Sequence, residues 1–318
     1  LVFGILTAIS GAVARTQSTQ YSAKYWDPDG RYSMVSVFLP EGSGLEQDNV
    51  RQLEYALDQA LIKEALEAPS DNARLYVSSY SVKTEASVSS QRSKSQTCTA
   101  YGVGGDFFRF HNYELISGSY LVEDSIMDDH VVLDEEAAWK IFGAIEVDGM
   151  TLTYDGKEYV VQGVVKPMDE FKSKAGGAES GTIFFPFSRI GGKADCYEII
   201  FPNLVSGFAV KQITEAFKSC GYDEDDIRIV DNSERYGFVN SVKRLVKWTN
   251  KGMSFKSLTY PYWENSAIAV ENIVDLLTFF RILFIVPPVI IVVVSIICFH
   301  PLHRFKLLVL KIVEHFKK

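Results

Sequence analysis

The longest apolar run lies near the C-terminal end of the chain, where residues 282–299 carry no charged side chain. A helix that spans a bilayer needs about 20 predominantly apolar residues. The run exceeds that length once the apolar residues before Arg281 are added and Arg281 extends its charge to the interface. The pattern therefore predicts a transmembrane helix over 272–299, the alternative being a helix buried in a protein core. Pro287 and Pro288 lie inside it and are expected to kink it, since each removes a backbone donor.

A second apolar segment, residues 1–14, ends just before Arg15. We interpret it as the outer end of a first transmembrane helix, of which part is missing because the chain begins at Leu1. The alternative is the apolar region of a signal peptide, since Ala12-Val13-Ala14 offers a small-residue cleavage site.

Residues 300–318 combine an apolar stripe with basic side chains. The stripe repeats every three or four residues, as on one side of a helix, at Leu302, Phe305, Val309, Ile312 and Phe316. A basic segment beside a spanning helix favours the cytoplasmic side. We therefore expect a cytoplasmic amphipathic tail on the inner leaflet, with the large domain extracytoplasmic. The start of a further helix, or a contact surface for a partner, remains an alternative for this tail.

Between the two apolar ends, the hydrophobic pattern predicts two strand–helix–strand units. Their ranges are 33–39, 44–68 and 74–88 for the first, and 196–201, 205–220 and 227–230 for the second. Two such units can complete one layer of helices on one face of a sheet. The predicted fold class is thus α+β, with this α/β part and its stalk spanning 15–104 and 193–271.

The segment between the units, residues 105–192, has a different texture and predicts an inserted, mostly β subdomain. It contains short strand patterns and one helix pattern, at 131–133, 150–154, 159–165, 182–185 and, for the helix, 135–142. Asp155-Gly156 between two of these strands is a strong hairpin signal. The long loop Asp169–Gly181 is the part of the insertion that we would expect to contact a ligand, a mobile surface loop being the alternative.

Residues 238–253 read as a further helix with four basic side chains, Lys243, Arg244, Lys247 and Lys251. It suits a stalk helix near lipid headgroups, although a solvated basic face explains the same pattern. Tyr260, Tyr262 and Trp263 follow and are expected to lie at the membrane interface.

Composition and motifs give little chemistry. The net charge of −8 does not favour nucleic acid. The four cysteines form no CxxC pair, and they leave open one disulfide among Cys98, Cys196 and Cys220. The sequence contains neither a GxxxxGK[ST] nor a GxSxG motif, and only His111 and His130 lie outside the tail. We therefore predict no catalytic, cofactor-binding or metal-binding residues in this chain.

An ordered series of short motifs runs through the middle of the chain. It consists of Asp106-Phe107-Phe108, Gly118-Ser119-Tyr120-Leu121, Leu133-Asp134-Glu135, Ala137-Ala138, Phe142-Gly143, and Val161 with Gly163-Val164-Val165. This series resembles the periplasmic core domain of MacB-type ABC transporter permeases. The resemblance implies a split βαβ porter-like unit with an inserted β-rich subdomain between two transmembrane helices, on a bacterial cell membrane. Ser119 stands where the family commonly has a basic residue, and the family usually adds two further helices.

The resemblance implies a membrane-anchored subunit that serves transport or mechanotransmission, and that is not itself an ATPase or hydrolase. Its partners would be membrane lipid, a separate ABC ATPase subunit and a further permease subunit, with an envelope protein or peptide as a ligand. The alternative function is a non-catalytic extracytoplasmic binding or sensor module on a membrane anchor.

Overall fold

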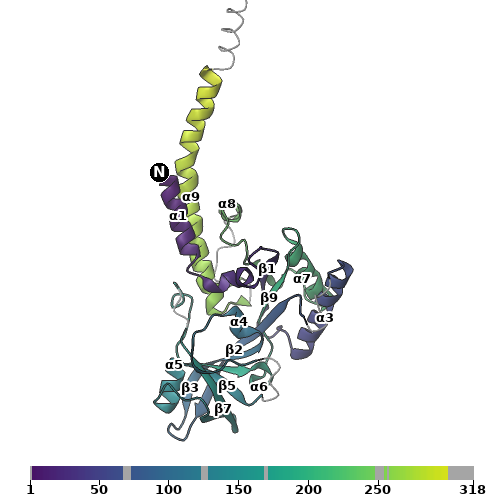
Figure 1. Ribbon diagram of the computed structural model, residues 1–318, viewed down its shortest axis with the longest axis vertical. Coiled ribbons are helices and arrows are strands. Elements are labelled where there is room, and N and C mark those ends of the chain that lie inside the picture. Colours follow the sequence, from purple (N-terminus) through teal and green to yellow (C-terminus); the bar gives the residue numbers. More distant parts are fainter. Residues whose placement is uncertain are drawn as a thin grey trace, which may run out of the picture.

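The computed structural model describes residues 2–66, 73–122, 128–167, 171–247, 254–255 and 258–299. Two helices, α1 (Val2–Ala14) and α9 (Tyr262–Phe299), lie side by side and project from an outer domain built around one large sheet (Figure 1). Strands of that sheet follow the order β10-β1-β9-β2-β3-β8-β5-β7-β4, and β6 pairs with both β2 and β7.

The part of the sheet near α9 is the predicted split βαβ arrangement. Its elements are β1 (Tyr32–Phe38), α3 (Gln47–Lys63), β2 (Val77–Ser89), β9 (Cys196–Pro202), α7 (Phe208–Ser219) and β10 (Arg228–Asp231). Strand β9 lies between β1 and β2 and is antiparallel to both, while β1 lies between β9 and β10. Each predicted strand–helix–strand unit is therefore confirmed, with the two units interleaved.

Helices α3 and α7 cover one face of these four strands (Figure 1). On α3 the buried residues are Val50, Leu53, Leu57 and Leu61, which repeat at the helical spacing and form the stripe that packs on the sheet. A reciprocal capping box between Glu46 and Asn49 satisfies backbone donors where the helix begins. Along β1, Val35 and Val37 point into this core, so Ser36 points to the opposite face.

The β-rich segment between β2 and β9 continues the same sheet. Its elements are β3 (Gln96–Gly105), β4 (Leu115–Gly118), β5 (His130–Asp134), α5 (Glu135–Phe142), β6 (Thr151–Tyr154), β7 (Lys157–Val165), β8 (Thr182–Pro186) and α6 (Phe187–Ile190). The four predicted strands and the helix over 135–142 are confirmed. Strand β3 was not predicted; it pairs with β2 along its length and with β8 in parallel. Strands β2 and β3 thus join the split βαβ part to this β-rich segment without a break in the sheet.

The remaining described elements are short. They are η1 (Ser18–Tyr21), α2 (Ser22–Trp26), α4 (Phe107–Phe110), α8 (Phe238–Val246), β11 (Ser254–Phe255) and β12 (Leu258–Thr259). Helix α8 is the first part of the helix predicted over 238–253, whose last residues lie largely outside the described part of the chain.

Helix α9 has 38 residues and is therefore about 57 Å long, well beyond the ~30 Å of a bilayer's hydrocarbon core. Its first turns are buried in the outer domain through Trp263, Ala267, Val270 and Val274. Within Tyr262–Ile296, its most apolar window has a mean hydropathy of 2.6 and contains no buried residue. A helix buried in a protein core would not leave this window uncovered, so the membrane interpretation fits α9 better. The helix continues through the proline pair, and the tail predicted over 300–318 lies outside the described residues.

Candidate functional site

A series of hydrogen bonds between buried polar side chains begins in the centre of the sheet. Nε2 of His111 donates to Oε2 of Glu198 on β9 at 2.7 Å. The other carboxylate oxygen of Glu198 accepts from Oγ of Ser36 on β1 at 3.0 Å, and Nδ2 of Asn232 donates to the same Oγ at 2.7 Å. All four residues are at most 3% exposed. The chain of hydrogen bonds therefore leads from the strand layer to the segment that follows β10.

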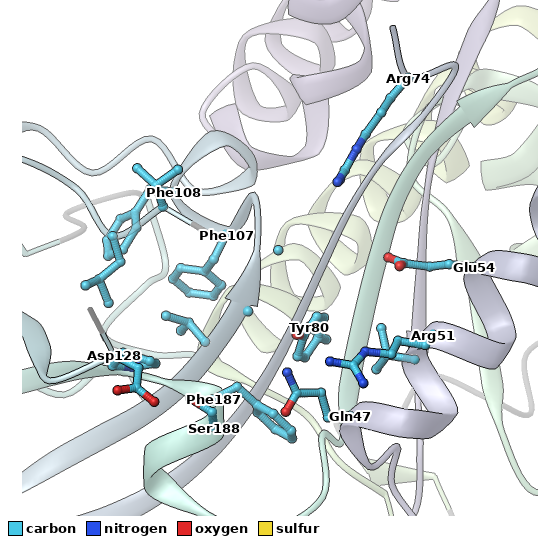
Figure 2. A pocket seen from close by; sticks show the side chains of 17 residues that line it. Gln47, Arg51, Glu54, Arg74, Tyr80, Phe107, Phe108, Asp128, Phe187 and Ser188 are labelled. Carbon is cyan, nitrogen blue, oxygen red and sulfur yellow. The ribbon is translucent and has the colours of Figure 1, made fainter. Parts of the chain in front are cut away.

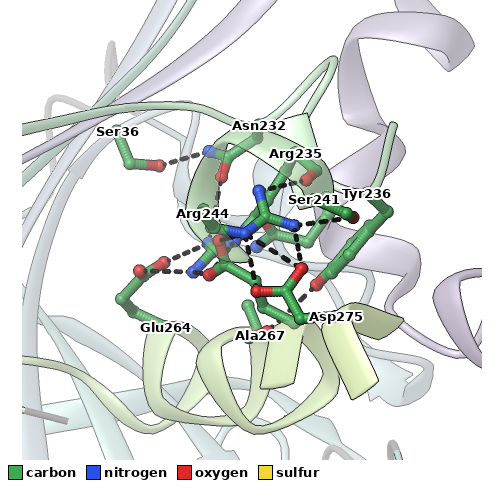
Figure 3. Close-up of polar contacts among 11 residues, drawn as sticks. Ser36, Asn232, Arg235, Tyr236, Ser241, Arg244, Glu264, Ala267 and Asp275 are labelled. Carbon is green, nitrogen blue, oxygen red and sulfur yellow. Dashed lines mark hydrogen bonds and ion pairs between the residues drawn. The ribbon is translucent and has the colours of Figure 1, made fainter. Parts of the chain in front are cut away.

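Arg235 extends this series of hydrogen bonds toward α9 (Figure 3). Its Nη1 donates to Oδ1 of Asn232 at 3.3 Å and to Oε2 of Glu264 at 2.6 Å. Its Nη2 donates to Oε1 of Glu264 at 2.7 Å and to Oε2 of Glu271 at 3.1 Å. Burial lowers the pKa of Arg235, but the two carboxylates outweigh it and hold that pKa above its ordinary value. Arg235 is thus a fixed positive charge inside the protein.

Arg244 of α8 forms the second half of the contact with α9. Its Nη2 lies 2.8 Å from Oδ1 of Asp275, and its Nε lies 2.7 Å from Oε1 of Glu271. Its Nη1 donates to the backbone carbonyl of Arg235 at 2.8 Å, and its Nη2 also donates to Oγ of Ser241 at 3.0 Å. Glu271 therefore bridges the two arginines. We call this set of bonded residues the junction network. Its members are His111, Glu198, Ser36, Asn232, Arg235, Glu264, Glu271, Arg244 and Asp275.

The sequence places the acidic members of the junction network on one side of α9. Glu264, Glu271 and Asp275 are separated by seven and four residues, which is the spacing of one helix face. Glu264 and Asp275 are at most 1% exposed. A buried charge is tolerated only when it is paired, so the two arginines fix how α9 sits on the domain.

The junction network has the properties of a structural connection rather than of an active site. Ser36 and His111 both bond Glu198 instead of each other, so they do not make a nucleophile–base pair. Among the described residues, no group of three or more His, Cys, Asp or Glu side chains could hold a metal ion. Cys98, Cys196 and Cys220 are free thiols.

Aromatic side chains anchor the first turn of α9 beside the junction network. The ring of Trp263 lies 4.3 Å from that of His111 and 5.7 Å from that of Tyr101, between ring centroids. The hydroxyls of Tyr262 and Tyr113 are 2.7 Å apart. The prediction of three interfacial aromatics is wrong for Tyr260 and Trp263, because both pack against the sheet and are at most 4% exposed. For half-buried Tyr262 it stays a prediction.

The expected contact loop, Asp169–Gly181, touches α9 as well. In its described part, residues 171–181, Gly176 O accepts from Nδ2 of Asn265 at 3.1 Å and Lys172 O accepts from Oγ of Ser266 at 3.2 Å. The loop thus packs on the base of α9, and its role in binding a ligand stays a prediction.

The basic side chains of α8 do not form one solvated face, which was the alternative interpretation of its sequence. Arg244 points to Asp275 and is largely buried, whereas Lys243 and Lys247 are exposed. The three described basic residues are therefore one structural arginine and an exposed lysine pair, and Lys251 lies outside the described residues.

A cleft of about 420 Å³ lies on the other side of the outer domain, between α3 and the β-rich segment. Figure 2 shows Gln47, Arg51 and Glu54 of α3 along one wall and Phe107 and Phe108 along the other. One wall is thus polar and charged, and the other is aromatic. Part of the cleft adjoins Gly104, where a Cβ atom would lie 2.2 Å from the ring of Tyr80. The glycine-rich run Gly102–Gly105 therefore makes room for a buried tyrosine, consistent with a role in strand packing rather than phosphate binding.

The chain matches one family of known proteins. The model of the MacB-like periplasmic core domain matches residues 1–218. Over 120 residues, the chain is 27% identical to the macrolide export ATP-binding/permease protein MacB of Shewanella sp. (strain W3-18-1). That alignment covers 37% of this chain and only 17% of the Shewanella protein.

Solved structures with similar folds include the periplasmic region of MacB from Actinobacillus actinomycetemcomitans. It is 20% identical, with a TM-score of 0.45 over 68% of this chain and 94% of that one. The extracellular domain of the noncanonic ABC-type transporter YknZ from Gram-positive bacteria is 10% identical, with a TM-score of 0.41 over 62% of this chain and all of that one. A domain of a putative permease protein from Porphyromonas gingivalis is 14% identical, with a TM-score of 0.38 over 63% of this chain and 88% of that one.

Proposed function

The chain belongs to the family of the MacB-like periplasmic core domain, and on this premise we propose that it is a mechanotransmission subunit of an ABC transport system. In this proposal α9 and α1 enter the cell membrane and the sheet domain stands on the extracytoplasmic side. The tail, residues 300–318, reaches the cytoplasm.

The junction network is the observation that carries the proposal. Helix α9 is continuous from Trp263, inside the outer domain, to the exposed apolar segment beyond Arg281. Arg235 and Arg244 clamp this helix through buried ion pairs. A tilt or shift of α9 cannot leave these charges unpaired without a cost of several kcal/mol, about 3–5 for each broken pair. Motion of α9 in the membrane would therefore move the strands β1 and β9 with it.

The energy for such motion would come from a separate nucleotide-binding subunit. No GxxxxGK[ST] sequence occurs within residues 1–318, and in this proposal a separate partner hydrolyses the ATP. The amphipathic basic tail is the proposed contact for that partner, and a further permease subunit would complete the membrane part.

Purification of the intact chain from its native membrane in mild detergent, followed by mass spectrometry, tests the proposal. We expect a P-loop ATPase in stoichiometric amount. Recovery of the chain alone, or only with envelope proteins, would instead favour a second function, that of an extracytoplasmic binding module.

That second function is an extracytoplasmic binding module, and the cleft beside α3 favours it. Its polar wall with Arg51 and its aromatic wall with Phe107 and Phe108 suit an amphipathic ligand such as a peptide. The two functions differ in partnership, because a binding module requires no ATPase.

A further inference from the structure

One side of α8 is apolar and uncovered. Phe238, Val239 and Val246 are 40%, 64% and 81% exposed, and half-buried Val242 lies on the same helical face. The opposite side carries Ser241 and Arg244, which face α9. A short helix of a soluble domain does not usually present its apolar residues to water and its polar residues to a neighbouring helix.

Two cation–π contacts place this exposed face at the level where α9 becomes an uncharged apolar helix. The guanidinium carbon of Arg281, the last charged residue before that segment, lies 4.7 Å from the ring centroid of Phe238. It also lies 5.3 Å from the ring centroid of Phe3 on α1. Phe238, Phe3 and Arg281 therefore stand at one height, and Figure 1 shows α8 beside α9 at the height of α1.

At this height α1, α8 and α9 all expose apolar side chains. Exposed apolar residues around Arg281 come from α1 and α9 and include Ile5, Ile9, Leu276, Phe279, Phe280 and Leu283. On α8, the exposed side chains of Lys243 and Lys247 follow the apolar face around the helix. An apolar face bordered by lysines is the pattern of a helix that lies in the headgroup region of a membrane.

We propose that α8 is an interfacial helix that rests in the outer leaflet. Phe238, Val239 and Val246 enter the boundary of the acyl chains, while Lys243 and Lys247 meet lipid phosphate groups. This inference rests on the proposed membrane span of α9. It implies that Arg244, on the opposite face, links the depth of α8 in the leaflet to Asp275 and hence to the junction network.

Spin-label accessibility in the full-length chain tests the proposal. The chain is reconstituted in nanodiscs of phosphatidylcholine and phosphatidylglycerol, with Cys220 and Cys298 replaced by serine and alanine. Single labels are attached to Val239→Cys, to Val205→Cys and to Leu283→Cys. Val205 precedes α7 and is 71% exposed, so it is the matched aqueous control, and Leu283 reports on the span of α9.

We expect the label at 239 to collide with oxygen and to lose accessibility to a nickel chelate, as the label at 283 does, while the label at 205 keeps nickel access. Lys243→Glu with Lys247→Glu should restore nickel access at 239, and Lys211→Glu on α7 should not. Nickel access at 239 equal to that at 205 would overturn the proposal. So would a label at 239 that meets neither reagent, because a protein partner would then cover α8. Nickel access at 283 would instead overturn the membrane span itself.

Discussion

The guanidinium of Arg235 binds both carboxylate oxygens of Glu264, at 2.6 and 2.7 Å, inside the base of the outer domain. Both side chains are at most 2% exposed. One of them follows a strand of the sheet, and the other belongs to the helix that leaves the domain. The pair therefore joins two parts of the chain that a transport subunit would need to move together.

Removing Arg235 should be costly. In Arg235→Met, the buried carboxylate of Glu264 loses its cationic partner while Glu271 keeps Arg244, and we expect the free energy of unfolding to fall by about 3–5 kcal/mol. Urea unfolding of the full chain in detergent, followed by circular dichroism, measures it. Arg51→Met is the control, since its pair with Asp48 is exposed and is worth about 0–1 kcal/mol. The double variant with Glu264→Met should recover part of the loss, and strict additivity of the two changes would contradict the pairing.

Gly176 fixes the loop that packs on α9. A Cβ atom there would lie 2.6 Å from the carbonyl oxygen of Tyr262 and 2.8 Å from the backbone nitrogen of Ser266. Gly176→Ala should lift the loop, speed amide exchange over 172–178 and cost about 1–3 kcal/mol of stability. Gly11→Ala is the control, because nothing lies within 4 Å of its added Cβ. Unchanged exchange in the Gly176 variant would show that the loop is not held by this contact.

The stability of the domain should fall as the pH rises toward neutrality, in part because of Asp195. Burial, with a smaller effect of Glu41, raises the pKa of Asp195 to about 7. The folded state then binds a proton more tightly than the unfolded state between about pH 4 and 7, so stability decreases as pH rises through that window. Asp195→Asn should be more stable than the natural chain by up to about 4 kcal/mol at pH 8 and equal to it at pH 4. Urea unfolding of both proteins at pH 4 and pH 8 measures this. The same difference in stability at both pH values would contradict a raised pKa of Asp195. Asp134, whose pKa burial raises to about 6, adds the same slope to both proteins.

Much of the fold was predictable because helices, strands and turns leave local patterns in the sequence. The buried stripe of α3 repeats at the helical spacing, and the Asp155-Gly156 turn has positive φ angles of 48° and 72°, as its sequence indicated. Strand β3 was missed because its residues, QTCTAYGVGG, are mostly small or polar. Its pairing with β2 and β8 comes from tertiary structure.

Two charged residues of the junction network stand out in the sequence. Glu198 is a charge within an otherwise apolar strand, and Asp275 is an acidic residue inside the predicted span. Buried charges require partners, so each pointed to an unidentified cation or histidine. Their partners His111 and Arg244 are distant in sequence, and only the folded chain brings them together.

The cytoplasmic tail should recruit the proposed ATPase. Deletion of residues 301–318 removes the amphipathic basic stripe while leaving α9 in place, and we expect co-purification of the ATPase to be lost. Quantitative mass spectrometry of the detergent extract measures this. Full recovery of the ATPase with the shortened chain would assign recruitment to another part of the protein.

The central claim is that α9 carries motion to the sheet through the junction network. Hydrogen exchange of the co-purified complex in nanodiscs, with and without ATP and vanadate, tests it most directly. We predict that nucleotide changes amide exchange in β1 and β9 as well as in residues 262–275. Asn232→Ala removes the side chain that links Ser36 to Arg235, so it should abolish the change in the strands while leaving that in the helix. A nucleotide effect on the strands that persists in Asn232→Ala, or that is absent from the natural chain, would contradict the account.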